Sequence, residues 1–104
     1  MAGDLNAEEF SKHVNTTFRP DLGAEAQVDL ELVEVRTYNS NPGDEEGMER
    51  FSLFFMGPAQ PLLPQRLYSM ANDGMGTVDI FLVAIKSDSK GSRYEAVFNL
   101  FKTD

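Results

Sequence analysis

The chain has 104 residues, a formal net charge of −8 and no cysteine. A chain of this length can bury about two-thirds of its unfolded surface in one core, so we expect a single β-rich domain over residues 1–104. The lack of cysteine excludes disulfides, thiolate nucleophiles and cysteine metal sites. Because the negative charge repels phosphate groups and the nine Lys and Arg residues are dispersed along the chain, we expect neither nucleic acid nor an anionic membrane as a partner.

Hydropathy and the N-terminal sequence indicate a cytoplasmic protein. The longest apolar run, residues 80–85, is much shorter than the roughly 18 residues of a membrane-spanning helix. Residues 1–15 carry three acids and lack the basic start and apolar stretch of a secretory signal. We therefore expect no signal peptide and no transmembrane segment.

One short helix is predicted near the N-terminus. Asn6 is suited to cap it, and Glu9 stands at the third helical position to complete a capping box. Phe10 and Val14 are four residues apart and form a narrow apolar stripe, so the helix should cover residues 7–14 and lie on a sheet. Residues 16–19 are predicted to form a short strand before a turn.

The next predicted strand begins at Gln27 and alternates apolar with acidic side chains. Val28, Leu30 and Leu32 share one face, and the alternation shifts by one residue at Val33. Such a shift indicates a β-bulge or a strong bend, which would let one long strand serve two edges of a barrel or sandwich.

Residues 38–49 are predicted to be a polar connection with an acidic cluster. Asp44, Glu45, Glu46 and Glu49 supply carboxylates, the ligand type that hard cations such as calcium prefer. The cluster lacks the alternating ligand spacing of a calcium loop, so a solvated surface is the main interpretation and an ion site the weaker one.

Four strands are predicted in the second half of the chain. They cover residues 51–56, 66–71, 77–86 and 93–101, and the last two should pair antiparallel through a hairpin loop at residues 87–91. The first of them is apolar on both faces, which is typical of a central strand. The expected fold is mainly β: a small antiparallel β-barrel or sandwich of five to six strands with one short N-terminal helix.

Catalytic signatures are absent, and we predict a protein that is not an enzyme and holds no cofactor. The sequence has no phosphate loop, nucleophile elbow or zinc helix motif, and His13 is its single histidine, which excludes any site that needs two imidazoles. A carboxylate-dependent hydrolase would need Asp79 and Glu95 across a cleft. Cross-strand pairing of Glu95 with Arg66 or Arg93 is the simpler expectation.

Two hypotheses of function remain open. The first is a non-enzymatic interaction or structural module that binds a protein partner or a second copy of itself, through an exposed strand edge or through the face of Phe54, Met56 and Phe101. Core packing is the main interpretation of these three side chains, and an interface or a small apolar pocket the weaker one. The second is a small-molecule or ion-binding β-barrel whose mouth lies between residues 39–49 and residues 72–76.

A set of short motifs lies in order along residues 51–99. They are Phe51-Ser-Leu-Phe-Phe, Leu63-Pro-Gln, Tyr68, Gly76, Ile80-Phe-Leu-Val and, most specifically, Tyr94-Glu-Ala-Val-Phe-Asn. In the order and spacing of these motifs, residues 51–99 resemble an uncharacterised family of small bacterial proteins, a domain-of-unknown-function family. Some of its members are encoded beside phage-tail-collar or microcystin-dependent-type proteins. The resemblance implies an accessory role in a tail-like or surface assembly, and it brings no catalytic residues to this chain.

Overall fold

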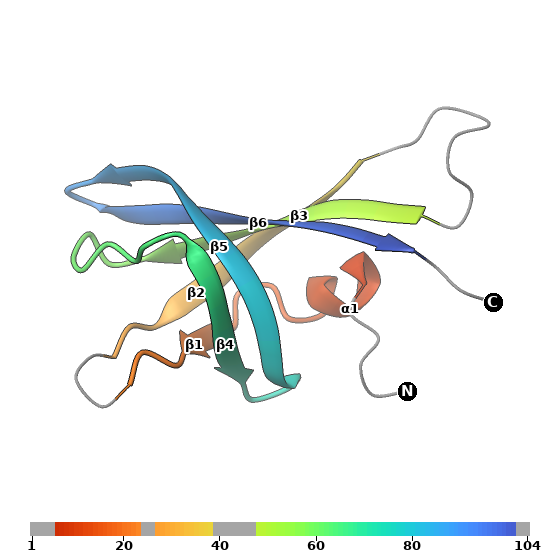
Figure 1. Cartoon of the computed structure of the whole chain (residues 1–104), viewed down its shortest axis with the longest axis horizontal. Helices are drawn as coiled ribbons and strands as arrows, with labels where there is room; N and C mark the ends of the chain where they lie inside the picture. Colours follow the sequence, from red (N-terminus) through yellow and green to blue (C-terminus); the bar gives the residue numbers. More distant parts are fainter. Residues whose placement is uncertain (1–5, 24–26, 39–47, 102–104) are drawn as a thin grey trace.

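The computed structural model describes residues 6–23, 27–38 and 48–101, which form six antiparallel strands and one short helix (Figure 1). The strands close into a barrel in the order β1-β2-β3-β6-β5-β4. The predicted mainly β fold with a short N-terminal helix is therefore confirmed, and the barrel is the form it takes. The elements are α1 (Ala7–Ser11), β1 (Thr17–Pro20), β2 (Leu30–Thr37), β3 (Met48–Gly57), β4 (Arg66–Asn72), β5 (Gly76–Asp88) and β6 (Gly91–Phe101).

Helix α1 has the predicted cap but ends earlier than predicted. The side-chain oxygen of Asn6 accepts a hydrogen bond of 2.7 Å from the backbone N–H of Glu9. The Glu9 carboxylate does not return to the cap; it lies 3.5 Å from both Lys12 and His13. The helix stops at Ser11 because the chain turns to join the sheet, where the backbone N–H of Asn15, at a φ of 74°, donates to the carbonyl of Leu32.

The barrel interior is filled by one alternating face of each strand. Predicted inward positions in the first half are confirmed, since Val28, Leu30 and Leu32 are all buried. Phe10 of α1 packs beside this core with its ring centroid 6.0 Å from that of Phe51 and 5.5 Å from that of Phe98. The largest fully buried side chains are Tyr68, Tyr94, Phe10, Phe18, Phe51, Phe55, Leu30, Leu32, Leu53, Met70, Ile80 and Leu82.

Two β-bulges shift the strand register. The first lies between Leu32 and Glu34 of β2, where the sequence predicted it. The second lies between Ala84 and Lys86 of β5 and was not predicted. Each bulge inserts one extra residue and so changes which side chains of its strand face outward.

Several strand ends differ from the prediction. β2 starts at Leu30, later than Gln27, and β3 starts at Met48 instead of Phe51. The hairpin between β5 and β6 is tighter than the predicted loop: the two strands stay paired up to Asp88 and Gly91. The Asp88 carboxylate accepts a 2.8 Å hydrogen bond from the backbone N–H of Lys90, which closes the turn locally.

Two buried tyrosines fix the connection between β3 and β4. The hydroxyl of Tyr94 accepts a 3.0 Å hydrogen bond from the backbone N–H of Leu63, and the hydroxyl of Tyr68 donates to the carbonyl of Pro64. Burial raises the pKa of the Tyr68 phenol, against a smaller lowering by the nearby guanidinium of Arg66. This connection is therefore part of the packed structure.

Strand β5 changes neighbours halfway along its length. Residues 76–82 pair with β4, and the ladder with β6 begins only at Val83, opposite Glu95. Figure 1 shows β5 turning away from β6 while β6 continues beside β3. As a result, residues 96–101 of β6 pair with β3 on one side only, among the residues the structure describes.

Candidate functional site

The outer face of β2, β3 and β6 holds an aromatic ring between two arginines. The ring of Phe54 lies 4.8 Å from the guanidinium carbon of Arg36 and 4.6 Å from that of Arg93. The Glu34 carboxylate bridges both arginines, at 2.9 Å and 3.1 Å. Because these side chains cover it, Phe54 is only 5% exposed. We call these four residues, Glu34, Arg36, Phe54 and Arg93, the arginine–phenylalanine cluster.

Both bulges turn a charged side chain toward this cluster. The bulge in β2 places Glu34 opposite Phe54, and the bulge in β5 places Lys86 opposite Arg93. Without the extra residue in each strand, strict alternation would put these two charges on the inner face. Bulges of this kind are common beside functional sites, where they re-aim a side chain. The outer face at Phe54 and Arg93 is therefore the strongest candidate site.

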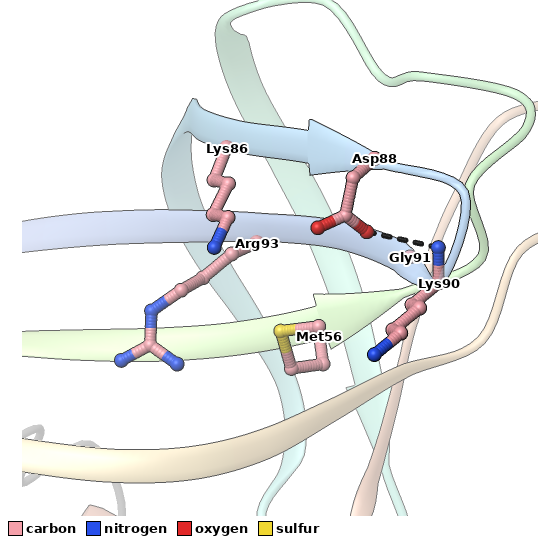
Figure 2. Close-up of a pocket in the computed structure, with 6 residues that line it drawn as sticks. All are labelled: Met56, Lys86, Asp88, Lys90, Gly91 and Arg93. Carbon is pink, nitrogen blue, oxygen red and sulfur yellow. Dashed lines mark hydrogen bonds between the residues drawn. The ribbon is translucent and has the colours of Figure 1, made fainter.

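A shallow groove adjoins the cluster at the β5–β6 hairpin and is shown in Figure 2. Its volume is about 280 Å³. Three cations and one carboxylate surround a half-buried methionine, so the groove is locally positive on a chain whose net charge is −8. The lining residues, which we call the basic groove, are Met56, Lys86, Asp88, Lys90, Gly91 and Arg93.

The hairpin needs glycine where it closes this groove. Gly91 has a φ of 153°, and a Cβ atom there would lie 2.8 Å from the carbonyl oxygen of Gly57 and 3.4 Å from the methyl carbon of Met56. The close approach of the two backbones thus fixes the hairpin against the end of β3. The charged residues of the groove are thereby held on a packed scaffold.

The predicted interaction residues have three different outcomes. Phe54 faces outward but is covered by the two arginines and is not an exposed contact. Met56 lines the basic groove. The backbone of Phe101 pairs with that of Met48 at the end of β6, and its side chain lies outside the described residues.

The predicted carboxylate pair is not brought together. Asp79 and Glu95 both lie on the outer face, but Glu95 is opposite Val83, four residues further along β5, which corresponds to about 13 Å. The prediction that Glu95 pairs with an arginine is wrong: its carboxylate accepts a 2.9 Å hydrogen bond from the Ser52 hydroxyl, and Arg93 binds Glu34 instead. Glu34 on β2 and Glu95 on β6 both lie opposite Phe54, and Arg93 forms its ion pair with Glu34.

The predicted ion cluster cannot be placed. Asp44, Glu45 and Glu46 lie outside the described residues, as does the side chain of Glu49. In the described part of the chain, no group of three or more His, Asp or Glu side chains could hold a metal ion. No helix within it is long and apolar enough to cross a membrane.

His13 lies in a second, polar pocket beside the β4–β5 turn. The pocket also contains Arg19 and Asp73, whose side chains form a 2.9 Å ion pair. Asn72 is buried there and satisfied: its amide nitrogen donates to the Thr16 hydroxyl and the Thr17 carbonyl, and its oxygen accepts from the backbone N–H groups of residues 74 and 75. These hydrogen bonds join the start of β1 to the β4–β5 turn, so Asn72 has a structural role in this pocket.

Sequence reasoning missed the basic groove. The cations Lys86, Lys90 and Arg93 are close in sequence, and a hairpin was predicted between them. The missing signal was the bulge at Ile85, because regular alternation places Lys86 on the opposite face from Arg93.

The fold and site define a small six-stranded antiparallel barrel whose charged side chains cluster on its outer face. A family model described as "Domain of unknown function (DUF6916)" matches residues 5–98, and the chain belongs to this family. The family match thus extends beyond the second half of the chain, where the resemblance was noted, and also covers α1, β1 and β2. Comparison with curated proteins and with solved structures finds no match.

Proposed function

We propose that the protein is a non-enzymatic interaction module that associates through the open edge of β6. The observation that carries this proposal is the uncharged run of residues 96–101, Ala-Val-Phe-Asn-Leu-Phe, on a strand half that pairs on one side only within the described chain. Such an edge presents unpaired backbone N–H and C=O groups, to which another strand can add.

Within the described chain, the other half-paired strand segments of three or more residues carry charges. Residues 33–37 of β2 include Glu34 and Arg36, the start of β4 is Arg66, and residues 76–82 of β5 include Asp79. Charged side chains on a strand edge oppose pairing with another chain. Residues 96–101 lack this protection, which supports a role for the β6 edge in binding.

The partner we propose is a second copy of the chain, with the two β6 edges paired antiparallel about a twofold axis. In a contact of this symmetry each residue meets the same short segment of the other copy. Because residues 96–101 are uncharged, no like charges face each other there, although each chain carries a net charge of −8. Val97, 60% exposed, would be covered on association.

Sedimentation velocity over about 5–500 µM protein tests this proposal. The wild-type chain should form a dimer, and added salt should strengthen it by screening the repulsion between two acidic chains. Val97→Lys should weaken the dimer at least tenfold, which corresponds to about 1.4 kcal/mol. Leu67→Lys is the matched control, because Leu67 is 59% exposed on the outer face of β4.

Two results would overturn the proposal. One is a chain that stays monomeric to about 500 µM. The other is a dimer that Leu67→Lys weakens as much as Val97→Lys, since this would place the contact on exposed apolar side chains in general. Circular dichroism of each variant checks that the barrel is intact.

Two features of the sequence interpretation stay predictions. The accessory role in a tail-like or surface assembly is a setting in which a self-pairing edge would be used, and we propose the cytoplasm as its location.

For the second hypothesis, a ligand inside the barrel has no support from the interior, which is packed with side chains such as Phe18, Phe55 and Leu53. The basic groove lies on the outside.

A further inference from the structure

The basic groove holds two cations directly opposite each other. Lys86 and Arg93 are register partners on β5 and β6 and share the outer face. Like charges at directly opposite positions of an antiparallel pair destabilise the sheet. The arrangement also depends on a bulge, because without it Lys86 would point to the other face.

The three cations of the groove differ in how well they are neutralised. Arg93 is paired with Glu34 and packed on Phe54. The ammonium groups of Lys86 and Lys90 have no hydrogen bond or ion pair to any described residue; the Asp88 carboxylate instead accepts from the backbone N–H of Lys90. Figure 2 shows Lys86 on one side of this carboxylate and Lys90 on the other, with the end of the Lys90 side chain beside Met56. Two cations are thus left to face a ligand.

The floor of the groove limits the class of anion. Met56 supplies an apolar, polarisable surface, and Gly91 adds no side chain. Asp88 lies in the same groove and would repel a dianion such as phosphate more strongly than a monoanion. A single carboxylate on a short apolar stem satisfies both features, since the stem can lie on Met56 while the oxygens reach the lysines.

We propose that the basic groove binds a monocarboxylate with an apolar stem, held by Lys86 and Lys90 against Met56. Such a group occurs on a free short-chain acid and on the C-terminus of a peptide that ends in an apolar residue. The groove volume of about 280 Å³ is near the lower end of the range for small-molecule pockets, so a short stem fills it. The site is separate from residues 96–101 at the other end of β6.

Titration of the ¹⁵N-labelled protein with sodium hexanoate, followed by amide NMR shifts, tests this inference. The amides of Lys90 and Gly91 should shift and saturate at millimolar hexanoate. The double variant Lys86→Gln, Lys90→Gln should bind at least tenfold more weakly. Lys12→Gln is the matched control, because Lys12 is an exposed lysine on another part of the molecule and should leave the titration unchanged.

Further ligands separate the parts of the inference. Inorganic phosphate and hexylamine should each bind at least tenfold more weakly than hexanoate. A short peptide that ends in leucine distinguishes the two sources, with its C-terminal amide as the control. If the peptide with a free carboxylate binds more tightly than hexanoate and the amide does not, the groove is assigned to a protein C-terminus. If the peptide with a free carboxylate binds more weakly than hexanoate, the groove is assigned to a free acid.

The inference is overturned by shifts that stay linear in hexanoate concentration, by equal binding of phosphate, or by a double variant that binds as the wild-type chain does. Val97→Lys should leave the hexanoate titration unchanged. Failure of the groove and failure of the β6 contact are therefore distinguishable.

Discussion

Replacement of Phe54 by alanine should destabilise the barrel although Phe54 lies on its outer face. The residue is only 5% exposed, and its ring lies between Arg36 and Arg93. Burial of a phenylalanine contributes about 1.5–3 kcal/mol, and each cation–π contact at an exposed site adds about 0.5–1 kcal/mol. Phe54→Ala should therefore lower the free energy of unfolding by about 3 kcal/mol.

Urea denaturation followed by circular dichroism measures this loss. With an m-value of about 1.5 kcal/mol/M for a small domain, a change of 3 kcal/mol lowers the midpoint by about 2 M urea. Phe81→Ala is the control: Phe81 also faces outward but is 45% exposed, so its replacement should cost about 1 kcal/mol or less. Phe54→Leu keeps most of the apolar volume and should cost about 1 kcal/mol, which isolates the contribution of the ring.

Two results would refute the reasoning about Phe54. If Phe54→Ala destabilises the protein no more than Phe81→Ala, the arginines do not hold the ring. If Phe54→Ala leaves stability unchanged but abolishes association, Phe54 is an exposed contact residue, as the sequence suggested, and the β6 edge is not the sole binding surface.

Three further predictions concern the framework of the barrel. Asn72→Ala should cost about 2–4 kcal/mol in urea denaturation, because it removes four hydrogen bonds at a buried position; a loss below 1 kcal/mol would contradict this. Gly91→Ala should lower the melting temperature more than Gly76→Ala, because both positions have positive φ but only the first Cβ would meet the Gly57 carbonyl; equal shifts would argue against that contact. Burial raises the pKa of the Tyr68 phenol in the folded state, so the contribution of Tyr68 to stability is fully present below pH 10.0 and is lost as the pH rises through the raised pKa. Tyr68→Phe should therefore reduce the loss of stability above pH 10.0. A variant with the same dependence of stability on pH as the wild-type chain would refute this.

Local patterns in the sequence were sufficient to predict most strands and, in β2 and β6, the inner face. In β6, alternation correctly placed Tyr94 and Ala96 inside and Val97 outside. The shifted alternation of β2 correctly predicted its bulge, because apolar and charged residues alternate clearly both before and after the shift. In β5, by contrast, apolar residues run continuously through residues 80–85, so no change of phase is visible at its bulge.

The site itself depends on contacts between strands that are distant in sequence. The strand of residues 51–56 is apolar on both faces, so alternation did not show that Phe54 faces outward; its burial depends on Arg36 and Arg93, which β2 and β6 bring from either side. The open edge of β6 likewise results from the turn of β5 toward β4. The sequence alone therefore determined which residues form most of the strands and, where apolar and polar residues alternate clearly, which face is buried, because these follow from local periodicity. Only the tertiary structure decided which outward side chains meet and which edge stays unpaired, because both depend on strand order and register.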